Sequence, residues 1–142
     1  MAGRFFGYEH ELVEYAGGLN FEKLLLDYVY DEAELEKTLN AHSPYFSKTS
    51  AVLYFHGKPG MTVVHQETAK QLSDTDGVAE TWLFYRDNEE IIKHGPNPYV
   101  ARYYITGETR EEIDALTRYF FEKMSITDAD GQEVLYQNII GE

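Results

Sequence analysis

The sequence predicts an α+β domain with a mainly antiparallel sheet, helices before the sheet and one long helix packed on it. Apolar residues recur at helical spacing near both ends of the 142-residue chain. Short apolar or alternating runs, separated by turn residues, lie between them. Because helices, then strands, then a helix follow one another, the order favours α+β over alternating βαβ units. The length fits a single domain.

Two helices are predicted before the sheet. The first covers residues 21–30, with Asn20 as its N-cap and an apolar stripe at i, i+3, i+4 and i+7. The second covers residues 32–39, where Asp31 and Glu34 have the spacing of a capping box. We expect both helices to use these side chains to satisfy backbone N–H groups at their first turns.

The strands are predicted from apolar runs bounded by turns. Residues 51–55 form a continuous apolar run, and residues 56–60 are rich in Gly and Pro. That turn leads to residues 61–66, which we expect to be the hairpin partner of the first strand. The remaining expectations are strands at 78–86, 99–106 and 133–136, a short helical turn at 68–72 and a turn at 87–90.

The strand at 99–106 is expected to bury one face. Side chains alternate between the two faces of a strand, and the more apolar set should point to the core. The inward set is Tyr99, Ala101, Tyr103 and Ile105, and the outward set is Val100, Arg102, Tyr104 and Thr106.

The clearest helix is predicted at residues 110–124. Thr109 and Glu112 have capping-box spacing. The apolar residues recur at i, i+3, i+7, i+8 and i+11, which is the stripe of a helix that packs on a sheet. These residues are Ile113, Leu116, Phe120, Phe121 and Met124.

Charge and composition exclude several classes of function. The formal net charge is −13, which repels phosphate, so we expect neither a nucleic-acid nor a membrane partner. The sequence contains no Cys, which excludes disulfides, thiolate metal sites and Cys nucleophiles. No apolar run approaches the roughly 20 residues of a membrane helix, and residues 1–7 lack a basic, apolar leader. We expect a cytoplasmic protein.

The N-terminal segment, residues 3–11, carries the densest set of candidate site residues. Arg4 lies between two glycines and can clamp a carboxylate or phosphate oxygen pair. Glu9, His10, Glu11 and Glu14 follow and could act as acid and base groups of a small enzyme. The same residue types also fit a frayed terminus with solvated charges, and the residues alone do not decide between these readings.

A metal site is not expected. The histidines lack ligand spacing on a helix, although His56 and His65 could face each other across the predicted hairpin. Asp128-x-Asp130-Gly131 hints at a calcium loop, but its Gly and the required Glu are out of register. A hairpin turn explains that segment better.

An ordered set of short motifs resembles the ATP-grasp enzymes. Gly3-Arg4-Phe5-Phe6-Gly7, followed by Gly17-Gly18-Leu19-Asn20 at a helix start, is similar to the stretch after the second metal-binding carboxylate of that family. There the pattern is Glu-x-Asn-x-Arg, a Gly, a spacer, and Gly-x-Asp/Asn. The later strands and the helix start at 107–112 follow in the family's order. The resemblance covers nearly the whole chain and is to the C-terminal part of the amino-acid and peptide ligase or biotin carboxylase-like branch.

The resemblance implies two site residues. Arg4 is the catalytic candidate, since the matching Arg contacts the phosphate or the acyl-phosphate intermediate, and Gly7 would shape the substrate-binding backbone beside it. Ala2 stands where the family has its metal-binding Asn, and Ala cannot coordinate Mg²⁺. No metal ligand is therefore expected in this chain.

The resemblance also implies the organisation and the chemistry. Residues 1–48 would be the end of a catalytic core and residues 49–142 a C-terminal subdomain of a larger ATP-dependent carboxylate–amine ligase. In that parent, Mg-ATP would phosphorylate a carboxylate and an amine would attack the acyl phosphate. The partners would be the remaining ATP-grasp lobes. The isolated chain would bind no cofactor and would be inactive.

A stand-alone acidic module for protein interaction or small-ligand binding is the alternative, with a homodimer as one form of it. If the chain instead belongs to a larger ligase, an apolar or aromatic patch should be exposed near the N-terminal helices and around Phe5, Phe6 and Tyr8.

Overall fold

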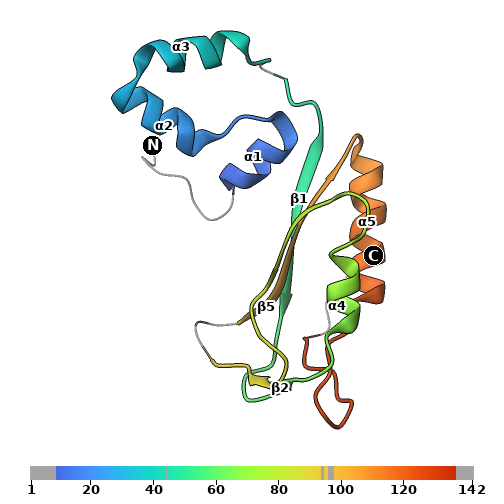
Figure 1. Ribbon diagram of the computed structural model, residues 1–142. Coiled ribbons are helices and arrows are strands. Elements are labelled where there is room, and N and C mark those ends of the chain that lie inside the picture. Colours follow the sequence, from blue (N-terminus) through green and yellow to red (C-terminus); the bar gives the residue numbers. More distant parts are fainter. Residues whose placement is uncertain (1–8, 44, 94, 96–97, 137–142) are drawn as a thin grey trace.

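A computed structural model describes residues 9–43, 45–93, 95 and 98–136, and it confirms the α+β class. Three helices gather at one end, a sheet runs along the molecule, and two further helices lie on one side of the sheet (Figure 1). In chain order the elements are α1 (Glu9–Gly17), α2 (Phe21–Tyr30), α3 (Glu32–Ala41), β1 (Thr49–His56), β2 (Thr62–Val63), α4 (Glu67–Leu72), β3 (Val78–Leu83), β4 (Glu89–Glu90), β5 (Tyr99–Gly107) and α5 (Arg110–Lys123). No helix among the described residues is long and apolar enough to cross a membrane.

The caps predicted for α2 and α3 are confirmed. The backbone N–H of Lys23 donates to Asn20 Oδ1 at 2.7 Å, and that of Glu34 donates to Asp31 Oδ1 at 3.1 Å. Helix α1 was not predicted, because its apolar residues are confined to residues 12–16, which is little more than one helical turn. It packs against β1 and β5, whereas α2 and α3 pack mainly on each other.

The sheet has the order β1-β5-β3, and both pairings are antiparallel. The expected hairpin between residues 51–55 and 61–66 is wrong, because β1 pairs with β5 and β2 pairs with β4 in a second small sheet. The segment predicted as a turn at residues 87–90 contains the short strand β4 at its end. Backbone hydrogen bonds explain the difference: Gly60 N–H donates to the Ile91 carbonyl, and Ile91 N–H donates to the Met61 carbonyl. These bonds direct the chain away from β1.

Central strand β5 is buried on both faces, which corrects the expectation of a single inward face. Tyr103 packs on Phe120 of α5, with ring centroids 4.8 Å apart. Tyr104 points the other way and packs on Tyr15 of α1 at 5.4 Å. Tyr99, expected inward, is 37% exposed. A register shift between Phe55 and His56, opposite Tyr99, breaks the alternation there.

The long helix α5 is confirmed with its cap and its stripe. The N–H of Glu112 donates to Thr109 Oγ1 at 3.2 Å, and Glu112 Oε2 accepts from the N–H of Glu108 at 2.8 Å, which completes a capping box. The predicted stripe faces the core: Ile113 and Phe120 are buried, and Leu116, Phe121 and Met124 pack against the same cluster.

The segment 133–136 pairs more sparsely than predicted. It makes isolated bridges, Gly57 with Leu135 and Thr127 with Glu133, and no strand is assigned to it. The preceding turn matches the hairpin prediction, since Asp128 Oδ1 accepts from the backbone N–H groups of residues 130 and 132. The Asp128 side chain is thus used by the turn itself.

Replacing Phe120 with Ala is expected to lower the free energy of unfolding by about 3–5 kcal/mol, because its ring is fully buried against Tyr103. The neighbouring Tyr119 is 43% exposed. Tyr119→Ala should therefore cost about 1 kcal/mol or less. Urea denaturation followed by circular dichroism measures both. Equal losses in the two variants would contradict the packing described.

Candidate functional site

The two site residues implied by the resemblance, Arg4 and Gly7, lie outside the described residues, as do Phe5, Phe6 and Tyr8. The chain that the structure describes begins at Glu9, the first residue of α1. Among the described residues, the candidate site consists of α1 and the sheet face on which α1 packs.

The acid/base group proposed on α1 is only partly brought together. His10 Nε2 lies 3.2 Å from Glu11 Oε2 and 3.4 Å from Glu22 Oε1. Glu14 has a different partner, since its Oε2 accepts a hydrogen bond of 3.0 Å from Asn20 Nδ2. The side chain of Glu9 lies outside the described residues. His10 and Glu11 are neighbours, whereas Glu14 supports the start of α2.

The histidines are separated. His56 and His65 do not face each other, because the expected hairpin does not form. The ring of His56 packs on Tyr99 at 4.8 Å, and His65 bridges to Thr127. Within residues 9–43, 45–93, 95 and 98–136, no group of three or more His, Asp or Glu side chains is placed to hold a metal ion.

Two hollows lie at the end of the sheet nearest α1. The larger, of about 790 Å³, is lined by Lys48 and by three carboxylate residues, Asp76, Glu108 and Glu112. A smaller hollow of about 440 Å³ between α1 and β1 shares Lys48 and Glu108. One cation among three carboxylates disfavours a phosphate group in the larger hollow, and in the smaller one Glu108 offsets the charge of Lys48.

The carboxylate of Glu80 on β3 ties α1 to the sheet. Tyr15 donates its hydroxyl to Glu80 Oε2 at 2.5 Å, and Trp82 donates its indole N–H to Glu80 Oε1 at 2.8 Å. On β1, the opposite edge strand of the sheet, Ser50 Oγ donates to the carbonyl of Leu12 at 2.7 Å. One charged acceptor thus fixes both the helix and an aromatic ring on the same face.

Arg102 lies under the rings of that face. Its guanidinium carbon is 5.3 Å from the centroid of Trp82, 5.6 Å from that of Phe84 and 5.2 Å from that of Tyr104. The residue is only 5% exposed. Such contacts are cation–π interactions, which gain strength when the cation is withdrawn from water. They fix the orientation of the rings above the sheet.

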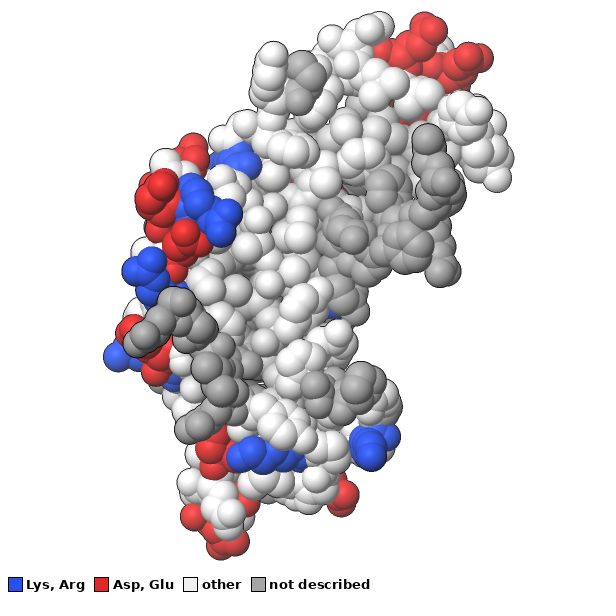
Figure 2. Space-filling view, turned by 180° about the vertical axis from the view of Figure 1, so that it is seen from behind, with Lys and Arg blue, Asp and Glu red and all other residues white. Residues whose placement is uncertain are grey.

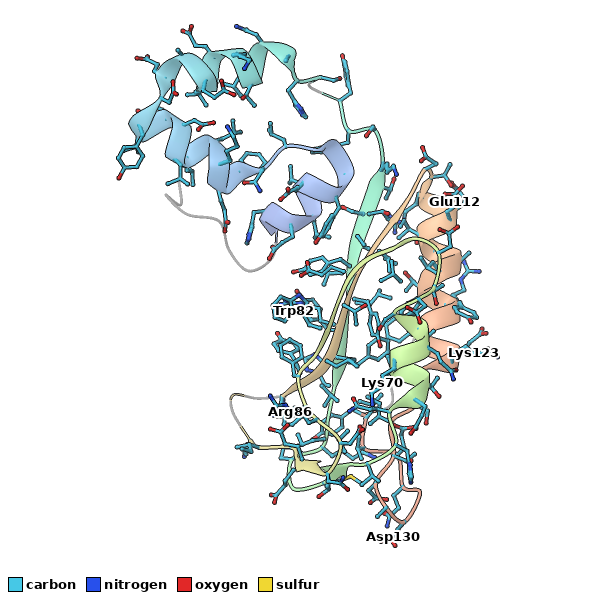
Figure 3. All side chains as sticks on the ribbon, in the orientation of Figure 1. Lys70, Trp82, Arg86, Glu112, Lys123 and Asp130 are labelled. Atoms are coloured by element: carbon cyan, nitrogen blue, oxygen red, sulfur yellow. The ribbon has the colours of Figure 1, made fainter. Side chains whose placement is uncertain are left out.

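Beyond α1 the same face is open and aromatic. Trp82 is 47% exposed and Phe84 is 41% exposed. The ring of Tyr99 lies beside Phe84, with centroids 6.2 Å apart. We call these three residues the aromatic surface. In Figure 3, Glu112 and Lys123 lie on α5 at one side of the sheet, and Trp82 lies on the opposite side.

Sequence analysis missed the aromatic surface, although a signal was present. Glu80, Trp82 and Phe84 alternate within the strand predicted at 78–86, which places them on one face. Arg102 and Tyr104 were placed on the outward face of their strand, and the structure pairs Trp82 with Arg102 and Glu80 with Tyr104. The missing information was that these two strands are neighbours.

Three tyrosines have raised pKa values. Burial raises the pKa of Tyr15, and the hydrogen bond to the Glu80 carboxylate raises it further. Burial also raises the pKa of Tyr103 and of Tyr104; the nearby Arg102 charge opposes the shift for Tyr104. All three hydroxyls therefore remain protonated well above neutral pH.

The fold is similar to part of two solved enzymes. No family model matches the chain, and no curated protein sequence matches it. The L-amino acid ligase from Bacillus licheniformis superposes with a TM-score of 0.68 at 18% identity, over 86% of this chain and 29% of that one. The phosphoribosylglycinamide synthetase from Anaerococcus prevotii gives a TM-score of 0.62 at 15% identity, over 84% and 30%.

These matches show that the chain shares its fold with a part of both enzymes. The chain spans less than a third of the length of either enzyme. At such low sequence identity the likeness shows the fold alone, and it does not assign the reaction of either enzyme to this chain.

Stability is expected to fall as the pH rises past about 10, the ordinary pKa of tyrosine. Folded Tyr15, Tyr103 and Tyr104 have raised pKa values, so the unfolded chain loses these protons first and alkali favours unfolding. Below that pH their contribution is fully present. Absorbance at 295 nm reports ionisation and circular dichroism reports the fold. Comparing the parent protein with each single Tyr→Phe variant assigns the absorbance change to one tyrosine. Ionisation of these three tyrosines near pH 10 in the folded protein would contradict the burial described.

Proposed function

We propose that this chain is the C-terminal portion of an ATP-dependent carboxylate–amine ligase and is catalytically incomplete alone. The observation that carries the proposal is the shared fold. Two enzymes, one named an L-amino acid ligase and the other a phosphoribosylglycinamide synthetase, contain this arrangement as under a third of their length. The division into residues 1–48, as the end of a catalytic core, and residues 49–142 belongs to the same proposal.

In the parent ligase, Mg-ATP would transfer a phosphoryl group to a carboxylate, and an amine would displace the phosphate. Arg4 would contact the phosphoryl group or the acyl phosphate, and Gly7 would let the backbone approach the substrate. The larger hollow is lined by three carboxylate residues and one lysine, so it is a poor cradle for phosphate groups. The groups that hold Mg-ATP would therefore come from the other lobes. A cytoplasmic location without nucleic-acid or membrane partners is part of this proposal.

A stand-alone interaction module is the second candidate. The apolar patch expected near the N-terminal helices of a ligase portion is found on α2, and it suits an interaction module as well. The exposed residues are Leu25, Leu26, Tyr28, Val29 and Tyr30. A surface of this kind fits a partner protein, and it also fits the missing lobes of a ligase. The size of the native protein separates the two candidates.

The first test is an immunoblot of source cells with an antibody raised to this chain. The proposal predicts a band several times larger than 16.4 kDa, the mass of the chain. The larger protein, purified, should cleave ATP only when an amino acid or another carboxylate is present. A native band at 16.4 kDa would overturn the ligase proposal and make the interaction module the leading candidate.

The isolated chain should bind Mg-ATP with a Kd of about 1 mM or weaker, as measured by isothermal titration calorimetry. The physical reason is its net charge of −13, which opposes a nucleotide polyanion unless a dedicated site is present. Mg²⁺ with AMP serves as the control for non-specific binding. Micromolar binding of Mg-ATP would show a complete nucleotide site and contradict the proposal.

A further inference from the structure

We propose that the aromatic surface formed by Trp82, Phe84 and Tyr99 is the face on which the preceding lobes of the parent ligase dock. This inference rests on the proposed function and deepens it by assigning the contact to one side of the sheet. The occupant is the polypeptide that precedes this chain in the larger protein.

The first argument is that the rings are already held in place. Trp82 is fixed by its hydrogen bond to Glu80 and by the guanidinium of Arg102 beneath it. Phe84 lies over the same guanidinium and beside Tyr99. Fixed aromatic side chains with an Arg beneath them are typical of residues that dominate protein contacts, because little side-chain entropy is lost on binding.

The second argument is the contrast with the opposite side of the molecule. The outer surface of α5 is strongly charged, as expected of a face in contact with water. Its exposed charged residues are Arg110, Glu111, Glu112, Arg118, Glu122 and Lys123. In Figure 2 charged side chains gather along the left edge, where the turn by 180° from Figure 1 places α5. The partner therefore belongs on the side away from α5.

The third argument is the path of the chain. Helix α1 packs on the same sheet face as the aromatic surface, through Tyr15 on Glu80 and Leu12 on Ser50 (Figure 1). Helix α1 is the first element that the structure describes, and it lies on this side of the sheet. Under the proposed function, lobes joined to the chain ahead of α1 would meet the aromatic surface without crossing an edge of the sheet.

A second copy of this chain fits the surface less well. Each copy carries a formal net charge of −13, so two copies repel each other at long range. Arg102 lies beneath the rings of the aromatic surface and is only 5% exposed, so its charge does little to offset that repulsion.

Hydroxyl-radical footprinting tests the assignment residue by residue. Trp82 is the only Trp of the chain, so its labelling is unambiguous. The isolated chain and the long native protein, if the immunoblot finds one, are labelled under the same conditions and read by mass spectrometry. We expect labelling of Trp82, Phe84 and Tyr99 to be largely lost in the long protein. Tyr119 on α5, which is exposed to a similar degree, is the matched control and should be labelled equally in both.

A pair of variants adds a second measurement. In the long protein, Phe84→Asp should restore the labelling of Trp82 and Tyr99, since a carboxylate at the contact opposes docking. Tyr119→Asp should leave it unchanged. Circular dichroism of both variants shows whether each is folded.

The outcomes separate the two proposals. Equal labelling of the aromatic surface in the isolated chain and a larger native protein would overturn this inference and leave the proposed function standing. A native protein of 16.4 kDa would overturn both. Labelling of the isolated chain that falls as its concentration rises would identify a second copy as the occupant and would also overturn the inference.

Discussion

The fold depends on one constraint, which is that β5 must be covered on both faces. The adjacent residues Tyr103 and Tyr104 are both fully buried and point in opposite directions. Tyr103 needs α5 and α4 above it: its ring packs on Phe120, and its hydroxyl donates to the carbonyl of Ala69 at 2.7 Å. Tyr104 needs α1 on the other face. Burying two large rings on opposite sides of one strand therefore dictates where three helices lie.

The two faces of the sheet are covered to different extents, and this difference gives the molecule its candidate site. Helices α4 and α5 cover one face, and their partners Phe55 and Ile105 are buried. The nine-residue α1 covers only one end of the other face. Glu80 marks the boundary: its carboxylate accepts from Tyr15 on the covered side and from Trp82 on the open side. Because both donors share one acceptor, the position of α1 and the orientation of the first exposed ring are coupled.

Local signals predicted α2, α3 and α5, but they missed α1 and could not predict which strands pair. Helix α5 follows from residues within one segment, the Thr109 cap and an apolar stripe, and so the sequence determines it directly. The partner of β1 is different, because Leu53 pairs with Tyr103 across most of the sheet-forming part of the chain. Residues 61–66 follow a turn rich in Gly and Pro and have the pattern of a hairpin partner for β1. The spacing of apolar residues does not exclude that pairing. The aromatic surface was missed for the same reason. The alternation within each strand is visible in the sequence, but the strand pairing that places Arg102 beneath Trp82 is not.

A small aromatic surface is sufficient if its partner belongs to the same chain. Two separate proteins that bind stably must offset the loss of translational and rotational freedom, and their interfaces commonly bury about 1,600 Å² in total. Three half-exposed rings fall well short of such an interface. A covalent connection removes most of that cost, because a short linker holds the partner at an effective concentration in the millimolar range. Three fixed rings on an otherwise acidic chain therefore favour a tethered lobe over a freely diffusing partner.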